Sequence, residues 1–159
     1  YLHDEEQEAA PTDLCIGAAC YPEKHPEALN LNVDIAYLKQ KVDAGAEYLV
    51  TQMFFDNAKY FHFVELCRDA GITVPIIPGL KPITNRRHIQ FLPKTFRVDL
   101  PDELASRLVA CRTDAEIKRV GVEWTIAQAR ELKEKGVPCL HFYTMGRGEA
   151  VQAVVEQVF

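Results

Sequence analysis

The sequence lacks the segments that anchor or direct a chain to a membrane. No apolar run approaches the roughly 20 residues that a helix needs to span a bilayer. The first residues, Tyr1 to Thr12, are acidic and polar, and they show neither the charge order of a signal peptide nor a periodic apolar pattern. We interpret residues 1–12 as a linker or frayed N-terminal segment, and we expect a cytoplasmic protein with no membrane partner.

The five cysteines also lack the spacing of a disulfide framework or a zinc site. Their count is odd, no pair is separated by two residues, and no histidine stands at ligand spacing from a cysteine. Free thiols in a reducing compartment and no bound metal are therefore expected. The net charge of −5 argues against nucleic acid as a partner.

Three common nucleotide-binding and hydrolase motifs are missing as well. The sequence contains no GxGxxG fingerprint, no Walker loop and no GxSxG elbow. These absences exclude the usual dinucleotide-binding turn, the phosphate-binding loop of the NTPases and the nucleophile of serine hydrolases. The chemistry of this chain must therefore come from another arrangement.

A repeated glycine pattern predicts the fold class. At Ala44-Gly45-Ala46, Ala70-Gly71-Ile72 and Lys135-Gly136-Val137, an apolar-periodic helix ends in glycine and a strand begins almost at once. We expect strands at about residues 14–20, 48–52, 74–79 and 139–143, and helices at about 33–45, 56–71, 86–92, 101–112, 114–136 and 150–158. Repeated βα units predict parallel strands, which both a doubly wound sheet and a barrel satisfy.

Local patterns refine this picture. The first strand is apolar throughout, which favours burial on both faces. Thr113 and Glu116 form a capping box before a helix that we expect to bury Ile117, Val120, Trp124 and Ala127. We interpret His141, inside the last strand, as a core histidine.

The predicted carboxyl ends of the strands carry aromatic and amide side chains. The loops there hold Tyr21 and His25, then Gln52 to Phe55, then Pro78 to Pro82, and finally Tyr143 to Arg147. Sites in parallel α/β folds lie at these ends, and aromatic rings beside amides suit a flat heteroaromatic ligand. Structural roles compete with this interpretation, and Phe54 and Phe55 in particular are more often core than site.

The loop motifs, in order, resemble the methylenetetrahydrofolate reductase family over about Cys15 to Phe159. The motifs are Tyr21-Pro22-Glu23-Lys24-His25-Pro26-Glu27, Lys41-Val42-Asp43-Ala44-Gly45-Ala46, Thr51-Gln52-Met53-Phe54-Phe55-Asp56, Ile76-Ile77-Pro78-Gly79-Leu80-Lys81-Pro82-Ile83 and His141-Phe142-Tyr143-Thr144-Met145-Gly146-Arg147. The resemblance implies a (β/α)₈ TIM barrel, of which residues 13–159 supply roughly the last four βα units.

The same resemblance implies an activity and a set of ligand contacts. The implied reaction is reduction of 5,10-methylenetetrahydrofolate to 5-methyltetrahydrofolate, with FAD as cofactor and NADH or NADPH as electron donor. Contacts to FAD would come from Tyr21, His25, Asp34, Tyr37 and Lys41. Contacts to the folate substrate or the nicotinamide would come from Gln52, Phe91, Leu92 and Met145.

Four positions depart from the family pattern. Cys20 stands where the family generally has glycine, Gln40 where an arginine is common, Lys81 where an apolar residue is typical, and Gly146 where asparagine is frequent. The general-acid glutamate of the family belongs to the first half of the barrel, so no catalytic residue is carried over to this chain.

The implied partners follow from this division of the barrel. We expect the missing N-terminal half and further copies of the chain, in a homo-oligomer, as partners, and we expect residues 13–159 alone to be inactive. Two alternatives remain open: a non-catalytic flavin-binding or interaction half-barrel module, and a barrel lyase that uses Lys81, the only lysine at a strand end.

Overall fold

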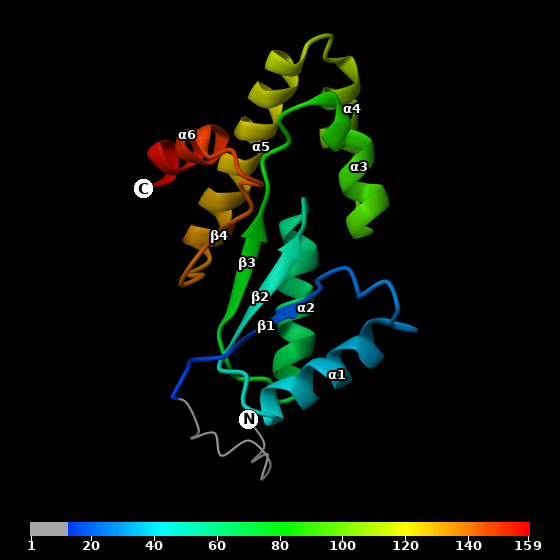
Figure 1. Cartoon of the computed structure of the whole chain (residues 1–159), viewed down its shortest axis with the longest axis vertical. Helices are drawn as coiled ribbons and strands as arrows, with labels where there is room; N and C mark the ends of the chain where they lie inside the picture. Colours follow the sequence, from blue (N-terminus) through cyan, green and yellow to red (C-terminus); the bar gives the residue numbers. More distant parts are fainter. Residues whose placement is uncertain (1–12) are drawn as a thin grey trace, which may run out of the picture.

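A computed structural model describes residues 13–159; the proposed linker at 1–12 lies outside these residues. The elements in chain order are β1 (Gly17–Cys20), α1 (Leu31–Asp43), β2 (Tyr48–Met53), α2 (Asn57–Asp69), β3 (Ile76–Leu80), α3 (Arg86–Phe96), α4 (Asp102–Ala110), α5 (Asp114–Glu134), β4 (His141–Phe142) and α6 (Glu149–Val158) (Figure 1). None of these helices is long and apolar enough to cross a membrane.

The four strands form one parallel sheet in the order β1-β2-β3-β4, which confirms the predicted parallel α/β fold. Each strand pairs with the next one along the chain, as repeated βα units require. The carboxyl ends of the strands therefore lie together at one edge of the sheet, the upper end in Figure 1.

Side-chain caps set the starts of the main helices. Asn30 accepts a hydrogen bond from the Val33 amide at 3.0 Å, so α1 begins two residues before the predicted start. Asp56 caps α2 in the same way. The capping box of Thr113 and Glu116 is present as predicted. The backbone N–H groups of Arg112 and Thr113 donate hydrogen bonds to the Glu116 carboxylate and lower its pKa.

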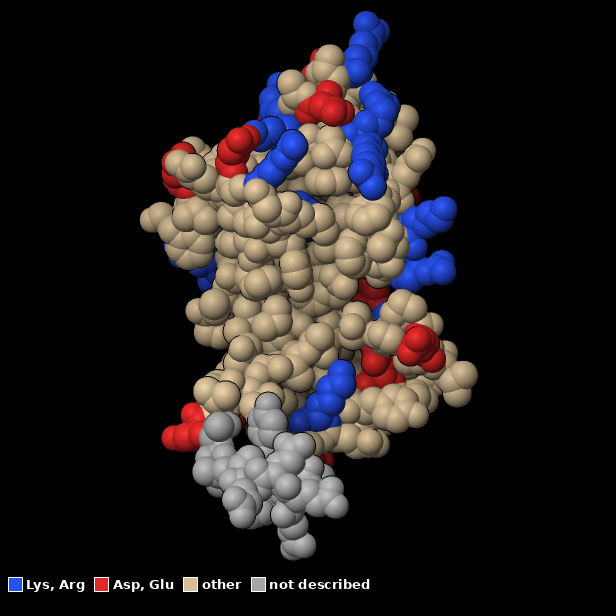
Figure 2. All heavy atoms as spheres, in the orientation of Figure 1, with Lys and Arg blue, Asp and Glu red and all other residues tan. Residues whose placement is uncertain are grey.

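The helices of the described residues cover only one face of the sheet. Residues of β2 alternate, with Leu49, Thr51 and Met53 buried and Tyr48, Val50 and Gln52 partly exposed. The buried side packs against α1, α2, α5 and α6 in a core cluster. Figure 2 shows that the middle of the viewed face is almost free of charged side chains. An uncharged, partly exposed sheet face therefore lies opposite the helices.

The prediction that the first strand is buried on both faces is wrong. Gly17 and Ala19 are exposed, whereas Cys20 is 1% exposed against the helices. Burial on both faces needs a second layer, and no described residue provides one over this strand. The exposed positions continue the open face of β2.

Two other burial predictions are wrong, each for its own reason. His141 is exposed and not a core histidine, because β4 is a two-residue edge strand. Ala127 is also exposed, because the buried face of α5 runs through Gly121, Thr125 and Gln128. Sequence periodicity alone placed this face about one position away from where it lies.

A second core cluster closes the upper end of the molecule. It joins Met53, the last residue of β2, and Phe55, just after β2, to residues of α3, α4 and α5, including the fully buried Leu92. Gly121 of α5 packs directly on the backbone of Ile83, where a Cβ atom would overlap the Ile83 carbonyl group. This close approach holds the segment after β3 against α5.

The contact at Gly121 makes a stability prediction. Gly121→Ala should lower the free energy of unfolding by about 1–3 kcal/mol, despite the better helix propensity of alanine, because the obstructing atoms are backbone. Urea unfolding, followed by circular dichroism, measures this free energy for the variant and the unmodified protein. Gly148→Ala, at a position with open space around it, is the control and should change the value by less than about 1 kcal/mol. Equal stability of G121A and the unmodified protein would contradict the packing argument.

Candidate functional site

The loop after β1 brings Tyr21 and His25 together. Their rings meet edge to face with centroids 4.6 Å apart. The backbone N–H of His25 donates to Oδ2 of Asp34, in the first turn of α1, at 2.7 Å. Burial, followed by the nearby Asp34 carboxylate, raises the pKa of Tyr21. Asp34 thus fixes the loop that carries both rings.

The outer face of α1 carries the other two residues predicted to contact a cofactor. Tyr37 is 57% exposed. Lys41 is exposed, and its Nζ donates to the carbonyl oxygen of Ala19, at the end of β1, at 3.3 Å. Both side chains are therefore accessible, and Lys41 reaches back to the strand end.

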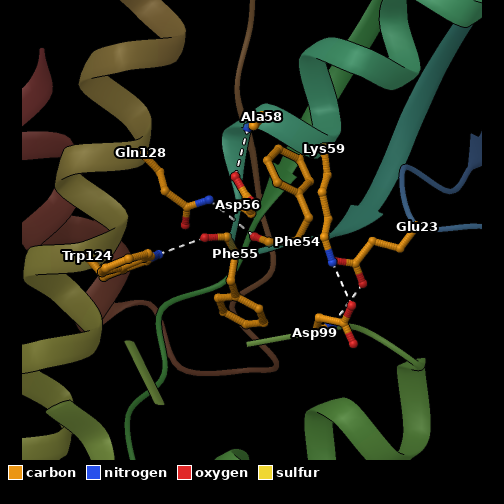
Figure 3. A network of polar contacts seen from close by, with 9 residues as sticks. All are labelled: Glu23, Phe54, Phe55, Asp56, Ala58, Lys59, Asp99, Trp124 and Gln128. Carbon is orange, nitrogen blue, oxygen red and sulfur yellow. Dashed lines mark hydrogen bonds and ion pairs between the residues drawn. The ribbon is translucent and has the colours of Figure 1, made fainter. Parts of the chain in front are cut away.

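The turn after β2 is held by α5 (Figure 3). Nε1 of Trp124 donates to the carbonyl oxygen of Phe55 at 2.9 Å, and Nε2 of Gln128 donates to that of Phe54 at 3.4 Å. Both phenylalanines are buried, at 0% and 1% exposure, which confirms the expectation that they are core residues. These bonds fix the backbone directly after Gln52.

Lys59 of α2 joins three segments at this end of the sheet (Figure 3). Its Nζ contacts Oε1 of Glu23 at 2.8 Å and Oδ2 of Asp99 at 2.6 Å. Burial alone lowers the pKa of Lys59, but the hydrogen bonds to Asp99 and Glu23 outweigh it, so the pKa is raised. The backbone N–H of Asp99 also donates to Glu23 at 2.8 Å. Lys59 therefore ties the loop of Tyr21 to α2 and to the segment after α3.

Gln52 and Tyr21 line one small cleft, together with Phe96, Arg97 and Val98. Oε1 of Gln52 accepts a hydrogen bond from the Met53 amide at 3.0 Å. The NH₂ group of Gln52 makes no hydrogen bond to residues 13–159. Two predicted site residues from different strand ends are thus brought together, with an amide donor still available.

A larger hollow of about 630 Å³ opens at the carboxyl ends of β3 and β4. Of the predicted residues, Phe91 and Met145 line it, whereas Leu92 is fully buried in the second core cluster. Its other lining residues include Lys81, Asn85, Arg87, His88, Asp114, Lys118, Tyr143, Arg147 and Glu149. The ligand roles of Phe91, Leu92 and Met145 stay predictions.

Tyr143 connects the floor of this hollow to β2. Its hydroxyl donates to the carbonyl oxygen of Thr51 at 2.8 Å, and Oγ1 of Thr51 accepts from the Gly79 amide at 2.8 Å. The Tyr143 ring covers Gly79, where a Cβ atom would lie 2.6 Å from it. Burial raises the pKa of Tyr143. Thr51 thereby links the carboxyl ends of β2, β3 and β4.

Sequence reasoning missed His88 as a site residue. It lies in the first turn of α3, and its ring nitrogen Nδ1 is 3.3 Å from the backbone nitrogen of Thr84. Burial, and then the positive charges of Lys81 and Arg87, lower the pKa of His88. A histidine three residues after the capping residue Asn85 was the only available signal.

Comparisons with known proteins agree on one family. The family model for methylenetetrahydrofolate reductase matches residues 6–159. A probable methylenetetrahydrofolate reductase (NADPH) of Caenorhabditis elegans is 36% identical over 90% of this chain and 22% of its own length. The 5,10-methylenetetrahydrofolate reductase of Escherichia coli is 38% identical over 89% of this chain and 48% of its own length. The chain thus spans about half of the bacterial relative.

A solved structure shows the same fold. It is an uncharacterized protein from Clostridium thermocellum that binds two copies of 5-methyl-5,6,7,8-tetrahydrofolic acid. The match has a TM-score of 0.62 and 21% sequence identity, and it covers 92% of this chain and 52% of the other. Here too, the described elements correspond to about half of the larger protein.

The bridge through Lys59 leads to a prediction with a matched control. Lys59→Met should lower the free energy of unfolding by about 1 kcal/mol, because Glu23 and Asp99 lose their shared cation, and the Asp99 amide should exchange faster with solvent. Chemical unfolding and hydrogen exchange measure the two effects. Lys39→Met removes an equally exposed lysine from a surface pair with Asp43 and should change stability by less than about 0.5 kcal/mol. Equal losses in the free energy of unfolding for both variants would show that the Lys59 bridge stabilises the fold no more than an ordinary surface ion pair.

Proposed function

The chain belongs to the methylenetetrahydrofolate reductase family, and from this we propose that it forms the C-terminal half of a (β/α)₈ barrel enzyme. The proposed reaction converts 5,10-methylenetetrahydrofolate, NADH or NADPH and a proton to 5-methyltetrahydrofolate and NAD⁺ or NADP⁺. The observation that carries the proposal is the open, uncharged face of the parallel sheet.

Parallel sheets are almost always covered on both faces. Here Tyr48, Val50 and Ile77 are only partly buried on the side away from the helices, and Gly17 and Ala19 are exposed. Within residues 13–159, β1 and β4 are the two edge strands, and neither pairs with a further strand on its outer side. Four further βα units would close the barrel, cover this face and pair both edges.

The relatives are long enough to supply those units. The matched region is 48% of the Escherichia coli enzyme and 52% of the Clostridium thermocellum chain. About as many residues again remain in each of them. We therefore propose that the remaining strands, and with them the proton donor to the folate, come from residues outside this chain.

The first group of site residues fits FAD. Lys41 offers an accessible ammonium, which suits a pyrophosphate, and Tyr21, His25 and Tyr37 offer rings for stacking or edge contacts. Asp34 is already engaged by the His25 amide, so its part is to hold the loop in place. When bound, FAD would relay the hydride from the nicotinamide to the folate.

The second group of site residues, Gln52, Phe91 and Met145, fits the folate and the nicotinamide, which would bind over the flavin in turn. The unengaged NH₂ group of Gln52 can donate to ring oxygens or nitrogens of a pterin, or to the carboxamide of a nicotinamide. Phe91 and Met145 offer apolar walls on the larger hollow. In this arrangement the residues of the chain bind and orient both ligands, and they exclude water from one side of the reacting rings.

The test uses the complete protein that contains this chain. It should purify with a flavin absorption band and oxidise NADH or NADPH when methylenetetrahydrofolate is present. A protein that keeps the flavin without this oxidation would favour the non-catalytic module. A protein that takes up no flavin would refute the proposal.

A matched pair of variants tests the cofactor contact. Lys41→Met should weaken FAD binding about tenfold or more, because a charged contact to the pyrophosphate is lost. Lys39→Met, two positions earlier on α1 and paired with Asp43, should keep its affinity within about twofold. Fluorescence titration of the apoprotein with FAD measures both. Identical affinities of the two variants would remove Lys41 from the site.

A further inference from the structure

Lys81, directly after β3, is a buried cation. Only 4% of its surface is exposed, and its neighbours Pro82 and Ile83 are buried too. Among residues 13–159 no hydrogen bond or ion pair reaches its side chain. Burial lowers the pKa of the Lys81 ammonium. Its Nζ atom still keeps some contact with solvent, because no enclosed side-chain nitrogen among the described residues lacks a hydrogen-bond partner. A mostly buried lysine that lines a hollow and has no protein partner there is a candidate contact for an anion.

The acidic residues near Lys81 are engaged by other groups. Lys81 lines the hollow of about 630 Å³, together with the acidic residues Asp114 and Glu149. Both acids are already engaged: Oδ1 of Asp114 accepts from the Arg86 amide at 3.0 Å, and Oε2 of Glu149 contacts Nζ of Lys118 at 3.1 Å. Neither acid is therefore the partner of Lys81.

The hollow as a whole has an excess of positive charge. Four cationic side chains line it, from Lys81, Arg87, Lys118 and Arg147, against the two acids. Figure 2 shows Lys and Arg side chains gathered at this upper end of the molecule, around α3, α4 and α5. An anion entering the hollow would meet a favourable potential before it reaches the Lys81 ammonium.

We propose that Lys81 binds an anionic group of the ligand in this hollow, a carboxylate or a phosphate, and so makes the hollow selective for acidic ligands. The proposal rests on the proposed function, which supplies two sources of such a group. A folate has two carboxylates on its glutamate tail, whereas NADH has a pyrophosphate. In the complex, the ligand's anionic group would be the ion-pair partner that residues 13–159 do not provide for the Lys81 ammonium.

The experiment compares charged ligands with neutral ones in the complete protein. The first pair is 5-methyltetrahydrofolate and its diamide, in which both carboxylates are carboxamides. The second pair is NADH and dihydronicotinamide riboside, which lacks phosphate. Calorimetric titration gives the four dissociation constants for the unmodified protein and for Lys81→Met. Methionine is close to lysine in length, and it removes the charge together with the N–H donors.

The charged member of at least one pair should bind about tenfold more weakly, or worse, to K81M, while the neutral members stay within about twofold. The affected pair identifies the source of the anion. Lys118→Met, whose ammonium is engaged by Glu149, is the control and should weaken charged ligands less than about threefold. Equal affinities of K81M and the unmodified protein for both charged ligands would overturn the role of Lys81.

Two further outcomes separate this inference from the proposed function. If the unmodified protein binds none of the four ligands, the proposed function fails, and the inference fails with it. If it binds the charged and neutral member of each pair equally well, the inference alone fails. This second comparison needs no variant, so it decides the matter even if K81M does not fold, as circular dichroism would reveal.

Discussion

The whole arrangement depends on parallel pairing of four strands that follow one another in the chain. Because the strands share a direction, the loops after β1, β2, β3 and β4 meet at one edge, and each contributes side chains to the same region. Because helices return on one side only, the opposite face stays open. The candidate site and the need for further strands are therefore two results of the same pairing.

The loops at this edge are held by contacts between segments far apart in the sequence. Lys59 connects Glu23 to Asp99, and Trp124 holds the Phe55 carbonyl group (Figure 3). Such contacts replace the rigidity that loops lack on their own. The rings and amides at the strand ends are thus presented by a braced surface before any ligand arrives.

Much of the fold follows from local chemistry in the sequence. The three glycines after helices predict the parallel units, and the caps at Asp56 and Thr113 mark helix starts. These features act within a few residues, so a single sequence reveals them. The grouping of Tyr21 with Gln52 follows in turn from the shared direction of neighbouring strands.

The failures have a different origin. Burial of β1 on both faces depends on a layer that the described residues do not contain, and the exposure of His141 follows from its place at a sheet edge. The placement of Phe91 on the larger hollow and of Leu92 in the second core cluster depends on the rotation of α3, which the sequence of one short helix does not reveal, and their ligand roles stay predictions. The burial of Lys81 likewise follows from tertiary packing, which no local pattern encodes.

Thr51 has a consequence for how this region can evolve. It accepts from Gly79 through its side chain and from Tyr143 through its carbonyl oxygen, and Tyr143 in turn covers Gly79. Changes at these three positions share atoms, so their energetic effects will not add. Mutational paths through this trio should therefore show strong epistasis, with replacements tolerated in combination that are harmful one at a time.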